Sequence, residues 1–154
     1  MKNDNKKNQV KLYNIMFPFW MIMALPSLLW LIIIPGNFAI DSLVLLIAVF
    51  VLKIENKKEM YKKHIWKIFG FGMISDIIGS ALMFISVLCG IGTMGDELYL
   101  TIPALMIASF FIFLFNYKFT FKDIEKQLRF KLALTFAIVT APYTFLVPSS
   151  WLYY

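Results

Sequence analysis

Residues 68–91 read IFGFGMISDIIGSALMFISVLCGI, an apolar run long enough to cross a lipid bilayer, and one aspartate, Asp76, lies inside it. A membrane-spanning helix needs about 20 apolar residues, because each residue advances it by about 1.5 Å across a hydrocarbon layer of about 30 Å. The helix predicted here, 65–91, begins eleven residues before Asp76, which places the carboxyl near the bilayer centre. A charge at that depth is costly, so Asp76 must face the interior of a helix bundle or carry a proton.

The composition of the whole chain also indicates a membrane protein. Of 154 residues, 60% are hydrophobic and only 16% are charged, whereas soluble domains carry about 25% charged residues. Membrane crossings of about 20 residues each leave room for short connections and for no soluble catalytic domain. We therefore expect a single membrane domain over residues 1–154.

Hydropathy and the positions of proline, glycine and charge predict an all-α, polytopic membrane helix bundle with five transmembrane helices. The predicted helices are at about 12–34, 38–53, 65–91, 98–116 and 129–147. A polar tail, 1–11, precedes them, and two basic loops are expected at 54–64 and 117–128.

The basic residues predict the orientation of this bundle. All 15 lysines and arginines fall in three clusters, at 2–11, 53–67 and 118–131, whereas the connections near 35–37 and 90–97 carry none. Lysine and arginine accumulate on the cytoplasmic side of membrane proteins. The pattern therefore places the N-terminus and both basic loops in the cytoplasm and the C-terminus outside, in a multi-pass protein of the cell membrane.

The second predicted helix is the shortest, with about 15 apolar residues where about 17 are normally needed. We keep it as a crossing, because without it the 53–67 cluster would share a side with the acidic connection near 90–97. A Pro-Gly-Asn turn at 35–37 is expected before it. Asn37 would then cap the helix, and Asp41 would lie in its first turn, where the helix dipole favours a carboxylate.

Small residues flank Asp76 at helical spacing, and no Lys, Arg or His lies at comparable depth in the predicted helices. Three interpretations are open. The carboxyl is neutral and hydrogen-bonded between helices, or it binds a proton, metal cation or cationic substrate, or it meets a base on a partner subunit. If Asp41 faces the same cavity, it is an outer binding position and Asp76 is a central one. The ligand- or ion-binding candidates are Asp76, Asp41, Asn37, Ser75, Ser80, Thr140 and Tyr143, and the helix-packing candidates are Gly72 and Gly79.

Thr140 and Tyr143 flank Pro142, which falls inside the last predicted helix. A proline in a membrane helix is a simple kink when neighbours satisfy the freed carbonyl. Broken helices also expose backbone at the binding sites of many transporters. Both interpretations of Pro142 are open.

The sequence lacks the signatures of enzymes and cofactor sites. The one histidine, His64, lies in a basic loop, and there is no metal-ligand cluster and no glycine-rich phosphate loop. We expect no enzyme activity, no cofactor and no metal centre. We also expect no nucleic-acid partner. The partners expected are the lipid bilayer, anionic headgroups at the cytoplasmic face, and either further copies of the chain or a partner membrane protein.

Residues 65–121 resemble the first half of the GtrA-like family. The resemblance rests on a membrane helix with an aromatic-x-Gly opening and a buried aspartate, followed by a return helix that ends in NYKFTF at 116–121. It implies movement of polyprenyl-linked sugars during cell-surface glycan synthesis. It would assign family positions to Gly70 or Gly72, Asp76, Asn116, Phe119, Thr120 and Phe121. The segments PGNFAIDSLVLL and GFGMISDIIG also resemble small integral membrane proteins of Gram-positive bacteria that have no assigned function.

Three functions are therefore expected, in this order. The first is a transport or translocation protein, or a subunit of one, whose central carboxylate binds a proton, a cation or a polar headgroup. The second is a non-transporting accessory or regulatory membrane protein that uses the Asp76 and Gly/Ser stripe as a helix interface. The third is the glycan-lipid translocation that the GtrA-like resemblance implies.

Overall fold

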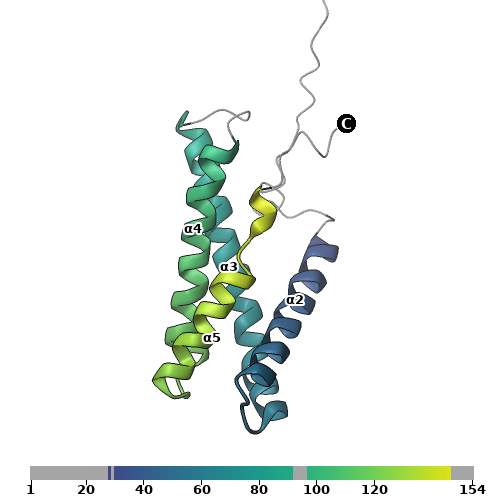
Figure 1. The fold of residues 1–154 in the computed structure, drawn as a ribbon. Helices are drawn as coiled ribbons and strands as arrows, with labels where there is room; N and C mark the ends of the chain where they lie inside the picture. Colours follow the sequence, from purple (N-terminus) through teal and green to yellow (C-terminus); the bar gives the residue numbers. More distant parts are fainter. Residues whose placement is uncertain (1–27, 29, 92–96, 147–154) are drawn as a thin grey trace, which may run out of the picture.

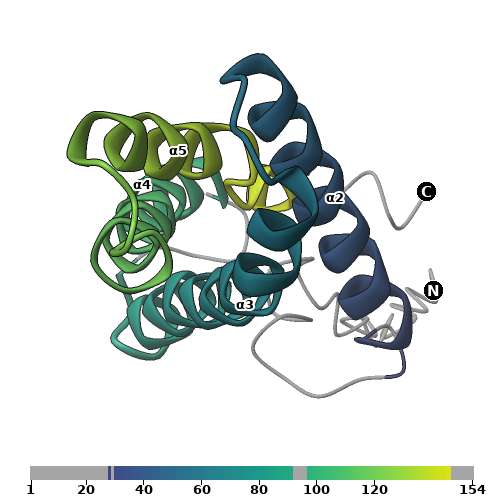
Figure 2. The same ribbon diagram turned by 90° about the horizontal axis from the view of Figure 1, so that it is seen from below.

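The computed structural model describes residue 28, residues 30–91 and residues 97–146, and this part of the chain is helical without strands. The long helices run alternately down and up (Figure 1). Seen from below, they follow one another around the bundle in chain order, and α5 returns to contact α2 (Figure 2). The elements are α2 (Trp30–Val51), α3 (Lys57–Leu88), α4 (Glu97–Phe115), η1 (Asn116–Thr120), α5 (Lys126–Val139) and η2 (Tyr143–Leu146).

Three helices in the described part are long and apolar enough to cross a membrane, namely Trp30–Val51, Lys57–Leu88 and Tyr99–Thr120. Their outward faces are apolar too: Leu31 is 72% exposed, Phe50 62% and Met106 68%. Contact with water does not stabilise such apolar surfaces, whereas lipid tails are as apolar as these side chains. These helices therefore suggest a membrane protein, in agreement with the predicted fold class. The 14-residue α5 is shorter.

The turn predicted at 35–37 is wrong, because α2 runs through it from Trp30 to Val51 with Pro35 inside the helix. Pro35 lacks one backbone N–H and so removes one helical hydrogen bond. A turn at this depth in a bilayer would leave several backbone groups unpaired, at several kcal/mol each. The helix that contains Asp41 is consequently 22 residues long and not short. Most of the predicted helix 12–34 lies outside the described residues.

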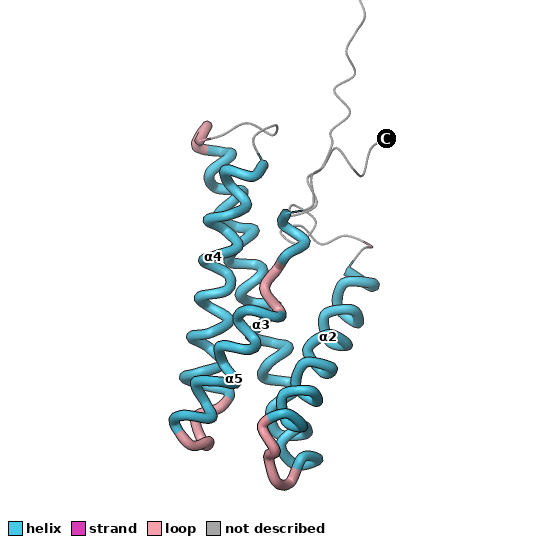
Figure 3. The backbone as a smooth tube through the Cα atoms, viewed as in Figure 1, coloured by secondary structure: helices cyan, strands magenta, loops and turns pink. Residues whose placement is uncertain are grey.

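Other boundaries also differ from the prediction. The expected loop 54–64 is largely helical, since α3 begins at Lys57 and buries Met60 and His64 in its first turns. The expected loop 117–128 starts with η1, a π-helical turn that continues α4. The expected helix 129–147 ends early: α5 stops at Val139, and a short break that contains Pro142 separates it from the 3-10 turn η2 (Figure 3).

The interior has two apolar clusters at different levels of the bundle. One cluster contains residues of all four long helices, including Leu45, Ile68, Ile112 and Phe136. It lies near the connections 52–56 and 121–125, here called the two basic turns. The other lies toward the opposite end and contains Met83, Leu100, Ala104 and Phe145. Along α3, Asp76 falls between Ile68 and Met83 and thus between the two clusters.

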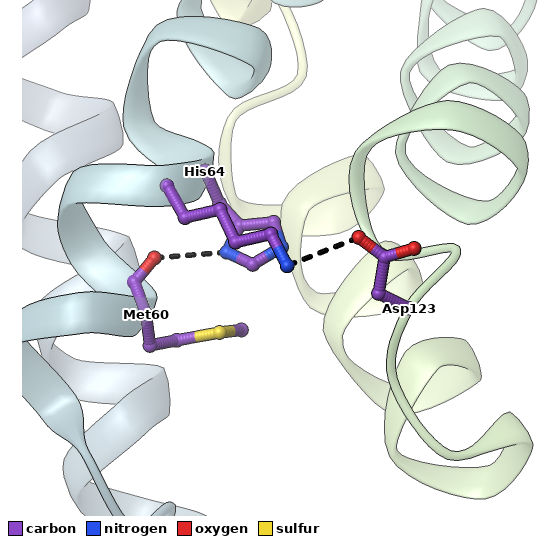
Figure 4. A network of polar contacts seen from close by, with 4 residues as sticks. Met60, His64 and Asp123 are labelled. Carbon is purple, nitrogen blue, oxygen red and sulfur yellow. Dashed lines mark hydrogen bonds and ion pairs between the residues drawn. The ribbon is translucent and has the colours of Figure 1, made fainter.

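The two basic turns lie at the same end of the bundle (Figure 1), and polar contacts around His64 and Asp123 join the elements there (Figure 4). Lys63 Nζ lies 3.1 Å from Asp123 Oδ2, which ties the start of α3 to the turn before α5. His64 is buried, and its Nδ1 donates to the carbonyl oxygen of Met60 at 2.9 Å. The hydrogen bond from Lys63 and its positive charge lower the pKa of the Asp123 carboxyl below the usual value. The charge clusters that the sequence shows at 53–67 and 118–131 are therefore neighbours in space.

Candidate functional site: a cleft with two carboxyls

Asp41 and Asp76 lie about one helical turn apart on two neighbouring antiparallel helices. Asn37 of α2 lies at the level of Asp76, because its Nδ2 is 3.5 Å from Asp76 Oδ2, and Asp41 lies one turn nearer the basic end, beside Gly72 of α3. Asp41 is eleven residues from the start of the 22-residue α2. Asp41 is therefore in the middle of its helix, and its predicted place in a first turn capped by Asn37 is wrong.

A cleft of about 280 Å³ contains both carboxyls. It lies between α2, α3 and the chain that follows α5, and it brings together residues from three separate parts of the sequence. Among the predicted candidates, the lining includes Asp41, Asp76, Asn37, Thr140, Tyr143 and Gly72. Asp41 and Asp76 thus line one cleft, which was the condition for an outer and a central binding position. Asp41 lies one turn nearer the basic end than Asp76 and is not the outer one.

Asp76 is 6% exposed, and its two carboxyl oxygens have different surroundings. Asn37 Nδ2 lies 3.5 Å from Oδ2, a long hydrogen bond, and the same distance from Met73 Sδ. Oδ1 is buried and accepts no hydrogen bond from the described residues. Buried polar atoms are almost always paired. A buried acceptor that belongs to a residue of the cleft wall and lacks a donor indicates that a proton or a ligand donor completes it.

Asp41 is also 6% exposed. A methyl group built on Gly72 would lie 3.5 Å from Asp41 Oδ2, so the carboxyl of α2 lies against the backbone of α3 at this glycine. The two carboxyls are close enough for their charges to repel each other. Among the residues that the structure describes, no Lys, Arg or His lines the cleft to offset them. Gly72, which we predicted as a packing position, therefore lies beside this carboxyl, and an added methyl group would make an ordinary van der Waals contact with it.

Thr140 and Tyr143 reach the cleft because α5 ends just before Pro142. Thr140 Oγ1 donates to the carbonyl oxygen of Phe136 at 2.9 Å, and the Tyr143 hydroxyl donates to the carbonyl oxygen of Ile138. The Phe136 carbonyl also accepts the backbone N–H of Thr140, whereas Pro142 has no N–H for the Ile138 carbonyl, and the Tyr143 hydroxyl supplies the donor there. The hydroxyl donors of Thr140 and Tyr143 are thus occupied.

Ser75, Ser80 and Gly79 are not among the residues that line the cleft. Ser75 Oγ donates to the carbonyl oxygen of Phe71 and Ser80 Oγ to that of Ile77, both on their own helix. At Gly79, an added Cβ would lie 2.9 Å from the Phe145 ring and 3.2 Å from the carbonyl oxygen of Ala104. Gly79 therefore lets α4 and η2 approach α3 closely within this chain.

Of the positions that the GtrA-like resemblance assigns, Gly72 and Asp76 line this cleft, whereas the NYKFTF residues at 116–121 lie near the basic end and do not. Asn116 is buried, and its Nδ2 donates to the carbonyl oxygen of Ile112. Thr120 and Phe121 are fully buried, and Phe121 packs against the rings of His64 and Phe136. Phe119 is 51% exposed. The motif is thus largely part of the core at the junction of η1 with α3 and α5.

Several lining residues escaped the sequence analysis. They include Ile33, Gly36 and Ile40 on α2, Met73 on α3, and Thr144 after the break. The signal for α2 was present, because Ile33, Asn37 and Asp41 recur every four residues along one helical face. It was hidden by the interpretation of Pro35 to Asn37 as a turn. Thr144 had no signal, because its position depends on the path of the chain after Pro142.

No family model matches the chain, and comparisons with curated proteins and with solved structures gave no match either.

Proposed function

We propose that the chain is a small membrane transport or translocation protein, or a subunit of one, in which the cleft binds a proton, a cation or a cationic headgroup at Asp41 and Asp76. The observation that carries the proposal is the unpartnered Oδ1 of Asp76, which is buried in the wall of a cleft that a second carboxyl lines and that, in the described part of the chain, no basic side chain lines. Carboxyls at membrane depth are costly and are typical of ion and proton pathways.

The position of the cleft supports a transport role. It is at the middle of α2, far from either end of a helix long enough to span a bilayer. One wall is a broken helix, since the chain leaves helical geometry between Val139 and Tyr143. Carboxyls at mid-depth next to interrupted helices are a common arrangement in membrane transporters.

The proposed membrane arrangement keeps five crossings in the cell membrane. It requires a further crossing before α2, in residues that the structure does not describe, and it counts α5 with the chain after it as the last crossing. The basic turns, which share one end of the bundle, would face the cytoplasm and anionic lipid headgroups. The opposite end carries the acidic connection near 90–97.

The two alternative functions make different demands on the cleft. An accessory protein that uses Asp76 only to hold helices together should tolerate an amide at that position, because an amide also accepts hydrogen bonds. A GtrA-like sugar-lipid translocase should depend on Asn116 and Phe119, which do not line the cleft. Changes at Asn116 or Phe119 would then alter surface glycans. Ion binding is tested separately, with Asp76→Asn.

The test is carboxyl infrared difference spectroscopy on the full chain in liposomes. Spectra of the wild type and of Asp76→Asn are compared across pH, with and without Na⁺, K⁺ or Mg²⁺. We expect a carboxyl band that titrates or shifts with a cation and that Asp76→Asn removes. Asp123→Asn is the matched control, because it removes an exposed carboxyl outside the cleft. A band that stays constant at every pH and with every cation would contradict the transport proposal and favour the accessory role.

A further inference from the structure

We infer that the cleft selects a small organic ammonium ion with an apolar body, in preference to a metal ion. This inference rests on the proposed function, because it assigns a chemical class to the cation that the two carboxyls would bind. It is carried by three observations: the polar groups of the cleft present acceptors, the other walls are apolar, and the described residues contain no cluster of three or more His, Cys, Asp or Glu side chains that could hold a metal ion.

The polar groups whose bonds the structure shows have their donors already in use. Asn37 Nδ2 points at Asp76 Oδ2 and Met73 Sδ, which leaves the amide oxygen as an acceptor. The hydroxyls of Thr140 and Tyr143 donate to carbonyls of α5. Ionised Asp41 and Asp76 only accept. A ligand that carries several N–H donors and a positive charge complements such a set, whereas a phosphate or a carboxylate does not.

Apolar side chains form most of the remaining wall. Ile33 and Ile40 come from α2, Val139 from the end of α5, and Ala141 and Pro142 from the break. A bare inorganic cation gains nothing from these groups, whereas a hydrocarbon body gains about 25 cal/mol for each Å² that it buries. The volume of about 280 Å³ is slightly below the range of about 300–1,000 Å³ of drug-sized sites. It therefore fits a small amine.

The cleft is less suited to a metal ion than to an ammonium ion. Ca²⁺ takes about six to eight oxygen ligands at about 2.3–2.6 Å, and Mg²⁺ needs near-octahedral geometry. The described residues contain no group of three or more His, Cys, Asp or Glu side chains that could hold a metal ion. An ammonium group needs fewer partners, because each of its N–H donors is satisfied by one acceptor. The two carboxyls and the Asn37 amide oxygen can supply them.

The experiment measures binding to the full chain in lipid nanodiscs by calorimetry, with three probes that share one ring. Benzylamine has charge and N–H donors, benzyltrimethylammonium has charge without donors, and benzyl alcohol has no charge. We expect benzylamine to bind and Asp76→Asn to weaken it by about tenfold or more, as for loss of a hydrogen bond to a charged group. Benzyltrimethylammonium should bind about tenfold more weakly than benzylamine, and benzyl alcohol should show no dependence on Asp76.

Two controls separate site binding from partition into lipid. Asp41→Asn should weaken benzylamine binding as Asp76→Asn does, and Asp123→Asn should leave it unchanged. The ammonium assignment is overturned if benzylamine binds equally to the wild type and to both cleft variants. If Na⁺ or Mg²⁺ still shifts the Asp76 carboxyl band in that case, the cation site stands and only its class was wrong. If no cation shifts the band, the proposed function fails as well.

Discussion

Asn37 Nδ2 lies 3.5 Å from Asp76 Oδ2, a contact between residues 39 positions apart in the chain. It connects α2 to α3 one turn away from the point where the Asp41 carboxyl lies against Gly72 of α3. Asn37 is the only neighbour among the described residues for which the structure gives a hydrogen bond to Asp76. The amide therefore orients the carboxyl and leaves Oδ1 for another partner.

Asn37→Leu should destabilise the bundle, because leucine has a similar size and no donor. Asp76 Oδ2 would then lose its partner, and a buried polar atom without one costs about 1–3 kcal/mol. The measurement is thermal unfolding in detergent, followed by circular dichroism. Thr135→Val is the control, because Thr135 Oγ1 bonds to its own helix at an exposed position. Equal unfolding temperatures for the two variants would contradict a role for Asn37 in joining the helices.

Gly79→Ala should also destabilise the protein, for a steric reason. Its new methyl group would meet Ala108 Cβ at 3.1 Å and the Ala104 carbonyl oxygen at 3.2 Å, and the latter is backbone that cannot turn away. Overpacking of this kind costs about 1–3 kcal/mol. Gly70→Ala is the matched change on the same helix, and nothing lies within 4 Å of its added Cβ.

For Gly70→Ala we expect no loss, or a gain of up to about 1 kcal/mol from the better helix propensity of alanine. Both variants are compared by their midpoints of denaturant unfolding in the same detergent. A Gly79→Ala midpoint equal to that of Gly70→Ala would show that α3 and α4 are not in close contact at this glycine.

The Asp123 carboxyl should titrate below its ordinary pKa of 3.8 in the folded protein, because Lys63 donates a hydrogen bond to it and carries the opposite charge. The folded pKa is lower than the unfolded one. The stabilisation is therefore fully present above the ordinary pKa and is lost as the pH falls through the folded pKa. The effect should shrink in high salt, since the pair is exposed.

Carboxyl carbon NMR shifts across pH report the titration midpoint of Asp123. Lys63→Gln should move this midpoint up toward 3.8, whereas Lys62→Gln, a change at a neighbouring lysine that does not form this ion pair, should move it less. Identical midpoints in both variants would mean that the Lys63–Asp123 pair does not form in solution.

Cys89 offers a direct test of orientation, because it is exposed where α3 ends and lies opposite the basic turns. A membrane-impermeant maleimide should label Cys89 in intact cells. In a Cys89→Ser background, Lys58→Cys should react only after the cells are permeabilised, because Lys58 lies at the basic end. The reverse pattern would invert the proposed topology.

The membrane-like character of this chain, the run that carries Asp76 and the clustering of basic residues could be read from the sequence. These properties are sums over neighbouring residues, namely hydropathy, length and local charge. The burial of Asp76 follows from the same sums, because a carboxyl within a long apolar helix is too costly to leave facing lipid. The helix through Asp76 was predicted for this reason, although its start was placed eight residues too late.

Only the tertiary structure decided the course of α2 and the composition of the cleft. Pro35, Gly36 and Asn37 have low helix propensity and favour a turn when they are considered alone. Their helical geometry is compatible with the fold because Asn37 contacts α3 and because unpaired backbone is costly in an apolar setting. Asp41 thereby moves from a helix end to a helix centre, next to Asp76, and the break at Pro142 brings Thr140 and Tyr143 to the same cleft. Sequence periodicity is confined to one helix at a time, so contacts among three separate segments arise only from how those segments pack.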